Sequence, residues 1–276
     1  MGQLISGVQI ADAIYADIQL KMRHSTQKVH LRGVIVGNDV ASLAYQNIKE
    51  SACQRCGFTY SRAVFAANVN QNQLINDLEA MCADPEITGV IVQLPLPAHL
   101  NQNAVLASID QSKDVDAFDY ILGNRITNVR PPAPRAMLKL FESTNQSMVG
   151  KKVVIVGHGF LVGQPLNVML EERGIKAEIV DSATSDAQDI IKSADVIFSG
   201  VGQANMITPD MIKTGVIIID AGYSRVDGVT YGDADPACLN KCSFMTPAIG
   251  GVGPLTVTVL MQNAFELVHQ PSTVAQ

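Results

Sequence analysis

The chain has 276 residues, of which 47% are hydrophobic and 17% are charged, and its formal net charge is −6. This composition excludes a disordered chain, and the acidic balance excludes the basic surface that nucleic-acid binding requires. No apolar run approaches the roughly 18 residues of a membrane span, and neither end carries a secretory or lipidation signal, so we expect a cytoplasmic protein without membrane partners.

The cysteines are expected to be free. Their odd number, 5, argues against a disulfide framework in a chain without a signal peptide. Cys53 and Cys56 form a C-x-x-C pair, which could be redox-active or supply half of a zinc site with Cys238 and Cys242. No thioredoxin-like context precedes the pair, so we interpret these residues as buried small apolar side chains. The histidines are scattered without ligand spacing, and we expect no metal site.

The first half of the chain alternates between strands and helices. Its predicted elements are a strand over 31–37, a helix over 42–56, a helix over 72–83 and a strand over 89–94. Gly57 ends the first helix, and either Asp39 or Ser42 is placed to cap its start. This alternation predicts parallel strands that are covered by helices.

A proline-rich segment, Arg130-Pro-Pro-Ala-Pro134, marks a boundary between two domains. It is stiff and interrupts strands and helices, so we expect only a connecting helix over 135–142 after it. The later predicted elements are strands over 152–157, 176–181, 195–199 and 216–220, helices over 165–173 and 185–193, and an amphipathic helix over 255–268.

The sequence therefore predicts an α/β fold of two domains, each a mainly parallel sheet with flanking helices. The first domain spans residues 1–125, and a C-terminal helix at about 255–276 packs back on it. The second domain spans residues 126–254.

The strongest local motif is a glycine-rich turn after the strand over 152–157. Gly157, Gly159 and Gly163 form a G-x-G-x-x-x-G pattern, and Pro165 falls in the first turn of the next helix. Glycines there let the backbone turn sharply and approach a pyrophosphate, which binds the free N–H groups of the helix N-terminus. The motif predicts a Rossmann-type dinucleotide-binding domain; the alternative is an ordinary strand-to-helix turn.

Asp181, at the end of the strand over 176–181, bears on the choice of dinucleotide. A carboxylate at this strand tip accepts hydrogen bonds from ribose hydroxyls and repels a 2′-phosphate, which favours NAD over NADP. The alternative is a loop residue that caps the next helix.

Tyr45 and Lys49 lie four residues apart on one predicted helix, and Ser42 precedes them on the same face. A Tyr-x-x-x-Lys pair also occurs in short-chain dehydrogenases, where it follows the dinucleotide fingerprint. Here the pair precedes that fingerprint, which argues against this class. Taken alone, the pair would be a surface Tyr and Lys of an amphipathic helix.

Further polar residues follow in the first domain. Gln93 ends a predicted strand, at the edge where open α/β sheets build their sites. Asp114 and Asp116 alternate along an extended segment, so both could point into one cleft. The alternative for these acids is a solvated charged loop.

These residues together resemble the bifunctional methylenetetrahydrofolate dehydrogenase/methenyltetrahydrofolate cyclohydrolase family over nearly the whole chain. The similar segments are Val36-Gly-Asn-Asp39 with Ser42, Tyr45 and Lys49, Gln93-Leu-Pro-Leu-Pro97, Lys113-Asp-Val-Asp116, Gly157 to Gly163, and Thr246-Pro247 with Gly250-Gly-Val-Gly-Pro-Leu-Thr256. Several motifs in family order are far more specific than any one of them.

The chain also departs from the family pattern. The departures are Ala117 for Gly, Pro247-Ala248-Ile249 for Pro-Val-Pro, Pro131-Pro-Ala-Pro-Arg-Ala136 for Pro-Cys-Thr-Pro-x-Gly, His158 for a common Arg, and Asp181-Ser182 for a His-Ser pair. The last two weaken the case for a 2′-phosphate contact and agree with NAD as the cofactor. The departures leave Tyr45, Lys49, Gln93 and Asp116 unchanged.

The resemblance implies two reactions. A hydride passes from the methylene carbon of 5,10-methylenetetrahydrofolate to NAD or NADP, which requires positioning in a cleft between two domains. Water then opens the methenyl product to 10-formyltetrahydrofolate, which requires proton handling. The implied partners are this folate substrate and a second copy of the chain in a homodimer.

The resemblance also implies catalytic roles. A partly neutral Lys49 activates water, and Gln93 holds that lysine by a hydrogen bond. Tyr45 packs its ring on the folate, and Asp116 accepts from N–H donors of the pterin. The other implied substrate residues are Ser42, Pro95, Gly253, Pro254 and Thr256. The implied cofactor residues are Gly157, His158, Gly159, Val162, Gly163, Asp181, Ser182 and Gly202.

Two other functions remain possible from the residues. One is a two-domain dehydrogenase of a small hydroxy or keto acid, which predicts an anion-binding Arg or Lys in the cleft. The other is a non-catalytic nucleotide-binding relative. Turnover of methylenetetrahydrofolate, followed as nicotinamide reduction, distinguishes all three.

Overall fold

The computed structural model describes residues 2–124, 127 and 129–269 and divides the chain into two compact units. The three-strand unit joins Ala13–Pro132 to Val257–Gln276, and the six-strand unit joins Met1–Asp12 to Ala133–Thr256. The sequence instead placed residues 1–12 in the first domain. They belong to the six-strand unit because the strand β1 (Gln3–Leu4) pairs with β11 (Phe244–Met245) of that sheet.

The three-strand unit has a fully parallel sheet with the strand order β3-β2-β4. Its elements up to β4 are α1 (Gly7–His24), which begins in the other unit, β2 (His30–Val36), α2 (Val40–Cys56), β3 (Thr59–Phe65), α3 (Gln71–Ala83) and β4 (Gly89–Val92). The Asp39 carboxylate caps α2 by accepting from the Ser42 backbone N–H at 2.8 Å, and Gly57 ends the helix with φ 76°. The predicted strands and helices of this segment are confirmed, while α1 and β3 were not predicted.

Shorter elements and a long C-terminal helix complete this unit. They are α4 (Gln102–Leu106), a 3₁₀ turn (Gln111–Lys113), α5 (Phe118–Ile121) and α9 (Val252–His269), in which the boundary between the units follows Thr256. From α9, the Asn263 amide donates to the backbone oxygens of Val115 and Arg130 at 2.8 and 2.9 Å. The C-terminal helix is therefore fastened to the loops of the three-strand unit beyond β4.

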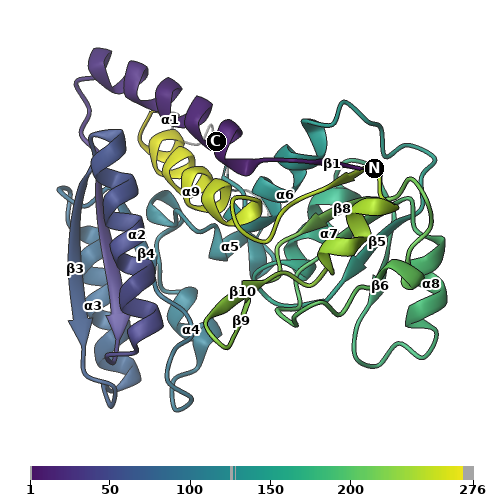
Figure 1. Cartoon of the computed structure of the whole chain (residues 1–276). Coiled ribbons are helices and arrows are strands. Elements are labelled where there is room, and N and C mark those ends of the chain that lie inside the picture. Colours follow the sequence, from purple (N-terminus) through teal and green to yellow (C-terminus); the bar gives the residue numbers. More distant parts are fainter. Residues whose placement is uncertain (1, 125–126, 128, 270–276) are drawn as a thin grey trace. The chain divides into compact units, whose positions relative to one another are not determined.

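The six-strand unit has the order β1-β11-β8-β7-β5-β6, and all its pairings are parallel (Figure 1). Its other elements are α6 (Pro132–Glu142), which begins in the other unit, β5 (Val153–Val156), α7 (Gly163–Glu171), β6 (Ala177–Val180), α8 (Ala187–Ser193), β7 (Val196–Ser199), β8 (Ile217–Asp220), and an antiparallel hairpin of β9 (Ser224–Val226) and β10 (Val229–Tyr231). Together with two short 3₁₀ turns (Pro209–Met211 and Pro236–Asn240), these elements confirm the predicted α/β class with a parallel sheet in each half.

One expectation about the proline-rich segment is wrong, because α6 begins at Pro132 and includes Pro134. The first turn of a helix has N–H groups without helical partners, so prolines there remove no hydrogen bond. The segment therefore starts the helix that was expected only from residue 135.

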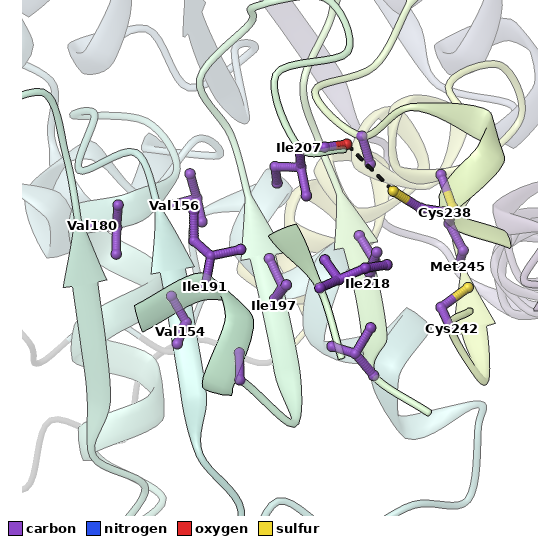
Figure 2. Close-up of a cluster of buried hydrophobic side chains, with 14 of the residues drawn as sticks. Val154, Val156, Val180, Ile191, Ile197, Ile207, Ile218, Cys238, Cys242 and Met245 are labelled. Carbon is purple, nitrogen blue, oxygen red and sulfur yellow. Dashed lines mark hydrogen bonds between the residues drawn. The ribbon is translucent and has the colours of Figure 1, made fainter. Parts of the chain in front are cut away.

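The core of the six-strand unit forms where apolar side chains from neighbouring strands meet those of α8 and the later turns. Figure 2 shows Val154, Ile197 and Ile218 of three adjacent strands in this cluster, with the Cys238 thiol donating to the Ile207 carbonyl at 3.3 Å. Burial raises the pKa of the Cys238 thiol to about 12. Cys53, Cys56, Cys238 and Cys242 are free and buried, which confirms their interpretation as small apolar side chains.

Within the part of the chain that the structure describes, no helix combines the length and the apolar character that crossing a bilayer requires.

Candidate active site

The ends of two adjacent strands build the candidate site of the three-strand unit. In the order β3-β2-β4, the chain leaves β2 toward one side and returns on the other, and ligands bind at such points beyond the carboxyl ends of parallel strands. Lys49 lies on α2, the helix that follows β2, and Gln93 directly follows β4. The Lys49 Nζ donates to the Gln93 Oε1 at 3.1 Å, so the structure brings these two predicted residues into contact.

Lys49 and Asp116 influence each other electrostatically. Desolvation lowers the pKa of Lys49, and the nearby Asp116 charge opposes this change. Desolvation likewise raises the pKa of Asp116, while Lys49 acts in the opposite direction. Burial thus disfavours the charged form of each group, and their mutual attraction favours it.

Asp116 also has an unsatisfied atom. Its Oδ2 is buried and has no hydrogen-bond partner within the protein. Leaving a buried oxygen without a partner costs about 1–3 kcal/mol, so the geometry suits a ligand that brings an N–H group to this point.

The remaining predicted substrate residues differ in position. Tyr45 is 44% exposed and lies one turn before Lys49 on α2, while Ser42 is buried in the first turn of that helix. Pro95 is exposed and follows Gln93 after the intervening Leu94. These residues belong to the same unit as Lys49.

Gly253, Pro254 and Thr256 begin α9 and fall in the six-strand unit. Gly253 and Pro254 are exposed, and the Thr256 hydroxyl donates to the Val252 carbonyl at 3.0 Å. Their placement toward the folate stays a prediction.

The expectation that Asp114 and Asp116 point into one cleft stays a prediction, and the structure gives Asp114 a contact of its own. Its side chain is buried, and its Oδ2 accepts from the Asp119 backbone N–H at 2.8 Å, at the start of α5. Burial raises the pKa of this carboxyl to about 7. Asp114 therefore supports the turn that carries Asp116 through its Oδ2, while its buried Oδ1, like the Oδ2 of Asp116, has no hydrogen-bond partner within the protein.

The glycine-rich turn of the six-strand unit connects β5 to α7 through a close approach of the backbone. Gly157 has φ 92°, and a Cβ on Gly163 would lie 1.9 Å from the Gly157 carbonyl oxygen. A Cβ on Gly159 would meet no atom within 4 Å, so space is open above that residue. Val162 caps α7 without a side-chain hydrogen bond. In the first turn the Gln164 N–H donates to the Gly159 carbonyl at 3.1 Å and Pro165 has no N–H, so an anion at this end would meet the Gly163 N–H and the positive end of the helix dipole.

The predicted cofactor residues surround the carboxyl ends of three adjacent strands. The turn follows β5, Asp181 follows β6, and Gly202 lies in the loop after β7. His158 and Ser182 are exposed. The Oδ1 of Asp181 accepts from the Ala183 backbone N–H at 2.9 Å and from the Thr184 hydroxyl at 3.1 Å.

Asp233 holds the loop that contains Gly202, and the sequence analysis did not single it out. Its buried carboxylate accepts from the Ser199 hydroxyl and from the backbone N–H groups of Val201, Gly202 and Gln203 at 2.6–2.8 Å. A Cβ on Gly222 would lie 2.2 Å from this carboxyl group. The carboxylate thus fixes the loop on the side of β5 opposite β6.

Asp220 at the end of β8 accompanies Asp233. It accepts from the backbone N–H groups of Gly222 and Ala234 at 2.7 and 2.9 Å. Burial, followed by the Asp233 charge, raises the pKa of Asp220 to about 7. An acid at the end of an apolar strand is the signal that identified Asp181, and it could have identified Asp220 as well.

Gln46 and Tyr60 were also missed, although they lie directly behind Gln93. The Gln46 amide nitrogen donates to the Gln93 Oε1 at 3.5 Å, and the Tyr60 hydroxyl donates to the Gln46 Oε1.

Among the described residues, no cluster of His, Cys, Asp and Glu is arranged to hold a metal ion.

Two family models match this sequence, one for each half. The catalytic domain of tetrahydrofolate dehydrogenase/cyclohydrolase matches residues 5–116, and the NAD(P)-binding domain of tetrahydrofolate dehydrogenase/cyclohydrolase matches residues 131–272. The chain belongs to the tetrahydrofolate dehydrogenase/cyclohydrolase family. The resemblance drawn from the motifs is confirmed.

Members of the tetrahydrofolate dehydrogenase/cyclohydrolase family match along nearly the whole chain. The bifunctional protein FolD of Cupriavidus necator is 37% identical over 273 residues, which cover 96% of each protein. The crystal structure of the bifunctional enzyme FolD from Campylobacter jejuni has a TM-score of 0.91 at 30% identity, over 97% of this chain and 99% of that one. The Trypanosoma brucei enzyme, complexed with NADP cofactor and inhibitor, has a TM-score of 0.89 at 28% identity, over 97% of each chain.

The two family matches divide the candidate residues into two sets. Lys49, Gln93 and Asp116 lie within the catalytic-domain match, and the turn over 157–163 lies within the NAD(P)-binding match. In this member of the tetrahydrofolate dehydrogenase/cyclohydrolase family, each set lies at the carboxyl edge of its own parallel sheet or on the elements that follow it.

Proposed function

We propose that this chain oxidises 5,10-methylenetetrahydrofolate with NAD(P)⁺ and hydrolyses the methenyl product to 10-formyltetrahydrofolate, in one-carbon folate metabolism. The observation that carries this function is the contact of Lys49 with Gln93 beside the incompletely paired Asp116, within a chain of this family. An amine that burial drives toward neutrality suits water activation next to a cationic substrate.

The residues of the six-strand unit fit a bound dinucleotide. The open space above Gly159 admits a pyrophosphate, and the start of α7 offers the Gly163 N–H and the positive end of the helix dipole. NAD(P), when bound, supplies the acceptor for the hydride. The protein contributes position, since the folate nitrogens themselves expel the hydride.

Lys49 serves the second reaction as the group that handles protons. The oxygen of water bonds to the methenyl carbon while one of its protons moves to the neutral Nζ of Lys49. The bond from this carbon to N5 then breaks, N5 takes up a proton as the hydroxyl group loses its own, and the formyl group stays on N10. Gln93 keeps Nζ in place by accepting one of its hydrogens. The amine is free to accept a proton only above its lowered pKa.

Asp116 and Tyr45 are proposed to hold the substrate. The buried Oδ2 of Asp116 would accept from an N–H donor of the pterin, which satisfies an atom that the protein leaves unpaired. Tyr45 exposes 44% of its surface and offers its ring for stacking on the folate.

The test measures both reactions with purified protein and then with Lys49→Met. We expect wild-type protein to reduce the nicotinamide with methylenetetrahydrofolate and to hydrolyse the methenyl compound. Lys49→Met should lose the hydrolysis by about 10²-fold or more and still bind folate, since general acid–base groups contribute roughly 10²–10⁴-fold. Full hydrolysis by the folded variant would remove Lys49 from this role, and a wild type without either activity would disprove the function.

We further propose NAD as the preferred cofactor, because the Asp181 carboxylate is exposed at the tip of β6. Initial rates with NAD should exceed those with NADP. Asp181→Asn keeps an oxygen for the Ala183 N–H and removes the charge, so it should improve the rate with NADP relative to NAD. Asp186→Asn, which changes an exposed acid at the start of α8, is the matched control. A wild type that prefers NADP would show that the Asp181 carboxylate does not govern selection.

The homodimer and the cytoplasmic location stay predictions. Light scattering behind size-exclusion chromatography checks the first, with twice the chain mass of 29.5 kDa as the expected result.

A further inference from the structure

Gln46 is a completely buried polar residue with no role in the reactions described above. It lies on α2 three residues before Lys49, and residues at this spacing share a helix face. The helix packs against β2 and β3, and the complete burial of Gln46 places this residue on the covered side of the helix. A buried carboxamide is costly unless both of its ends are hydrogen-bonded, and the partners of Gln46 therefore matter.

A chain of hydrogen bonds with one direction connects Tyr60 to Lys49 through two glutamines. The Leu94 carbonyl oxygen sets this direction, because a carbonyl oxygen can only accept a hydrogen bond. It accepts one from the Gln93 Nε2 at 2.8 Å. The Gln93 Oε1 must then face the other way, toward the Gln46 Nε2 at 3.5 Å and the Lys49 Nζ at 3.1 Å.

The same reasoning extends to the far side of Gln46. Its Oε1 faces the Tyr60 hydroxyl, which donates to it. Burial raises the pKa of Tyr60, so the phenol keeps its proton at neutral pH and remains a donor. Every group in the chain therefore has one orientation that satisfies it.

Gly33 makes room for this arrangement. An ideal Cβ at this position of β2 would lie 1.9 Å from the Tyr60 hydroxyl oxygen and 2.2 Å from the Gln46 Oε1. Any larger residue would occupy the space where the two groups meet. The missing side chain is thus a requirement of the hydrogen bond between Tyr60 and Gln46.

We propose that Gln46, supported by Tyr60 and Gly33, is a positioning residue for the hydrolysis step that keeps the Gln93 oxygen turned toward Lys49. This inference rests on the proposed function of Lys49. With an acceptor facing it, the amine donates a hydrogen to Gln93 and its lone pair points elsewhere. If Gln93 were reversed, its NH₂ group would bind that lone pair and block the amine as a base.

The reversed state is unfavourable only because of its neighbours. It would place the NH₂ groups of Gln46 and Gln93 against each other and the Gln93 oxygen against the Leu94 carbonyl. Removing the polar group at Gln46 removes one of these two penalties and makes the reversed state accessible. Since a hydrogen bond contributes about 0.5–1.5 kcal/mol, the ratio of the reversed to the productive orientation should rise roughly 3- to 10-fold, and kcat for hydrolysis should fall in proportion to the productive fraction that is lost.

The experiment compares Gln46→Met with Gln54→Met, the same change at an exposed position of the same helix. Hydrolysis of the methenyl substrate and reduction of the nicotinamide are both followed from pH 6 to 9. For Gln46→Met we expect a lower kcat for hydrolysis, an unchanged KM, an unchanged dehydrogenase rate, and a pH profile displaced to lower pH. The displacement follows because a donor facing Nζ disfavours its ammonium form, whereas the other titratable groups that act on Lys49, Asp116 and Cys53, are unaltered. Gln54→Met should equal the wild type.

Tyr60→Phe is the second variant, since it leaves Gln46 in place and removes only the hydroxyl that fixes it. It should reduce kcat for hydrolysis in the same direction and to a smaller extent. Wild-type kinetics in folded Gln46→Met or Tyr60→Phe would overturn the inference, as would an equal fall of both reactions. Because the wild type and Lys49→Met are measured in the same series, failure of the inference is distinguished from failure of the proposed function.

Discussion

The carboxyl group of Asp220 is buried. The group accepts two backbone hydrogen bonds, yet its pKa stands at about 7, against an ordinary value of 3.8, because desolvation and the charge of Asp233 both oppose ionisation. Asp114 in the three-strand unit also has a pKa of about 7 through burial. At the scale of single residues, the chain thus holds protons in its folded state that its unfolded state would release.

Stability should therefore depend on pH in a defined direction. Between about pH 4 and pH 7 the folded protein retains the Asp220 proton and the unfolded chain loses it, so the free energy of unfolding falls as pH rises through this window. Asp220 accounts for up to about 4 kcal/mol of this change in the free energy of unfolding. Urea unfolding at pH 5, 6, 7 and 8 should show a shallower dependence for Asp220→Asn than for the wild type.

The control for this measurement is Asp227→Asn, which removes an exposed acid in the hairpin turn of the same unit. It should keep the wild-type dependence on pH. A wild-type stability that rises from pH 5 to pH 7 would contradict the effect of Asp220 and Asp114 together.

At the scale of elements, the junction of β5 with α7 depends more on Gly163 than on Gly159. A methyl group at Gly163 would collide with the Gly157 carbonyl, while one at Gly159 would extend into open space. We expect Gly163→Ala to lower the free energy of unfolding by about 1–3 kcal/mol, as overpacking does. Gly159→Ala should change it by less than about 0.5 kcal/mol, as changes at exposed positions usually do.

Thermal melting of both variants without any cofactor checks this expectation. Equal stability of the two variants would show that the backbone can separate β5 from α7 at little cost. The comparison also separates the structural role of the turn from its role in binding, since no ligand is present.

Most elements could be predicted because their hydrophobic pattern is strong. The strands β2, β4, β5 and β8 are apolar runs that end in glycine or polar residues, as buried parallel strands do. The strand β3 is a partly exposed edge that contains Ser61 and Arg62, so its pattern is weak. The helix α1 was missed although it buries Ala11, Tyr15 and Ile18 at helical spacing.

The candidate site was predictable to the extent that it follows from strand ends. Lys49 and Gln93 meet because each follows a strand of the same switch point. Gln46 and Tyr60 depend on the empty space at Gly33, which involves two strands and a helix, and no spacing along the sequence records such a contact. The structural role of Asp114 likewise follows from its burial, which its alternation with Asp116 does not reveal.

At the scale of the whole molecule, each unit has its own sheet and its own set of candidate residues. A ligand that binds the folded form of one set stabilises the unit that carries it. NAD(P) alone should therefore protect the amides of the 157–163 turn and of the 200–203 loop from hydrogen exchange.

A concentration of NAD(P) 100 times its Kd corresponds to about 2.7 kcal/mol of stabilisation. Hydrogen–deuterium exchange with peptide resolution checks where that protection falls. Under the same conditions β2 and β4 should exchange as they do without ligand. Equal protection of β2 and β4 by NAD(P) alone would show that this ligand engages the three-strand unit as well.

The pairing of β1 with β11 affects the order of folding during translation. Gln3 lies opposite Phe244, so the edge strand β1 is synthesised about 240 residues before its partner β11. At a synthesis rate of roughly 5–20 residues per second, this delay is about 10–50 seconds. The three strands of the smaller sheet are complete by Val92, long before that. The nascent chain therefore carries β1 without its partner while the residues between β1 and β11 are made, and the larger sheet can close only after Phe244–Met245 has emerged.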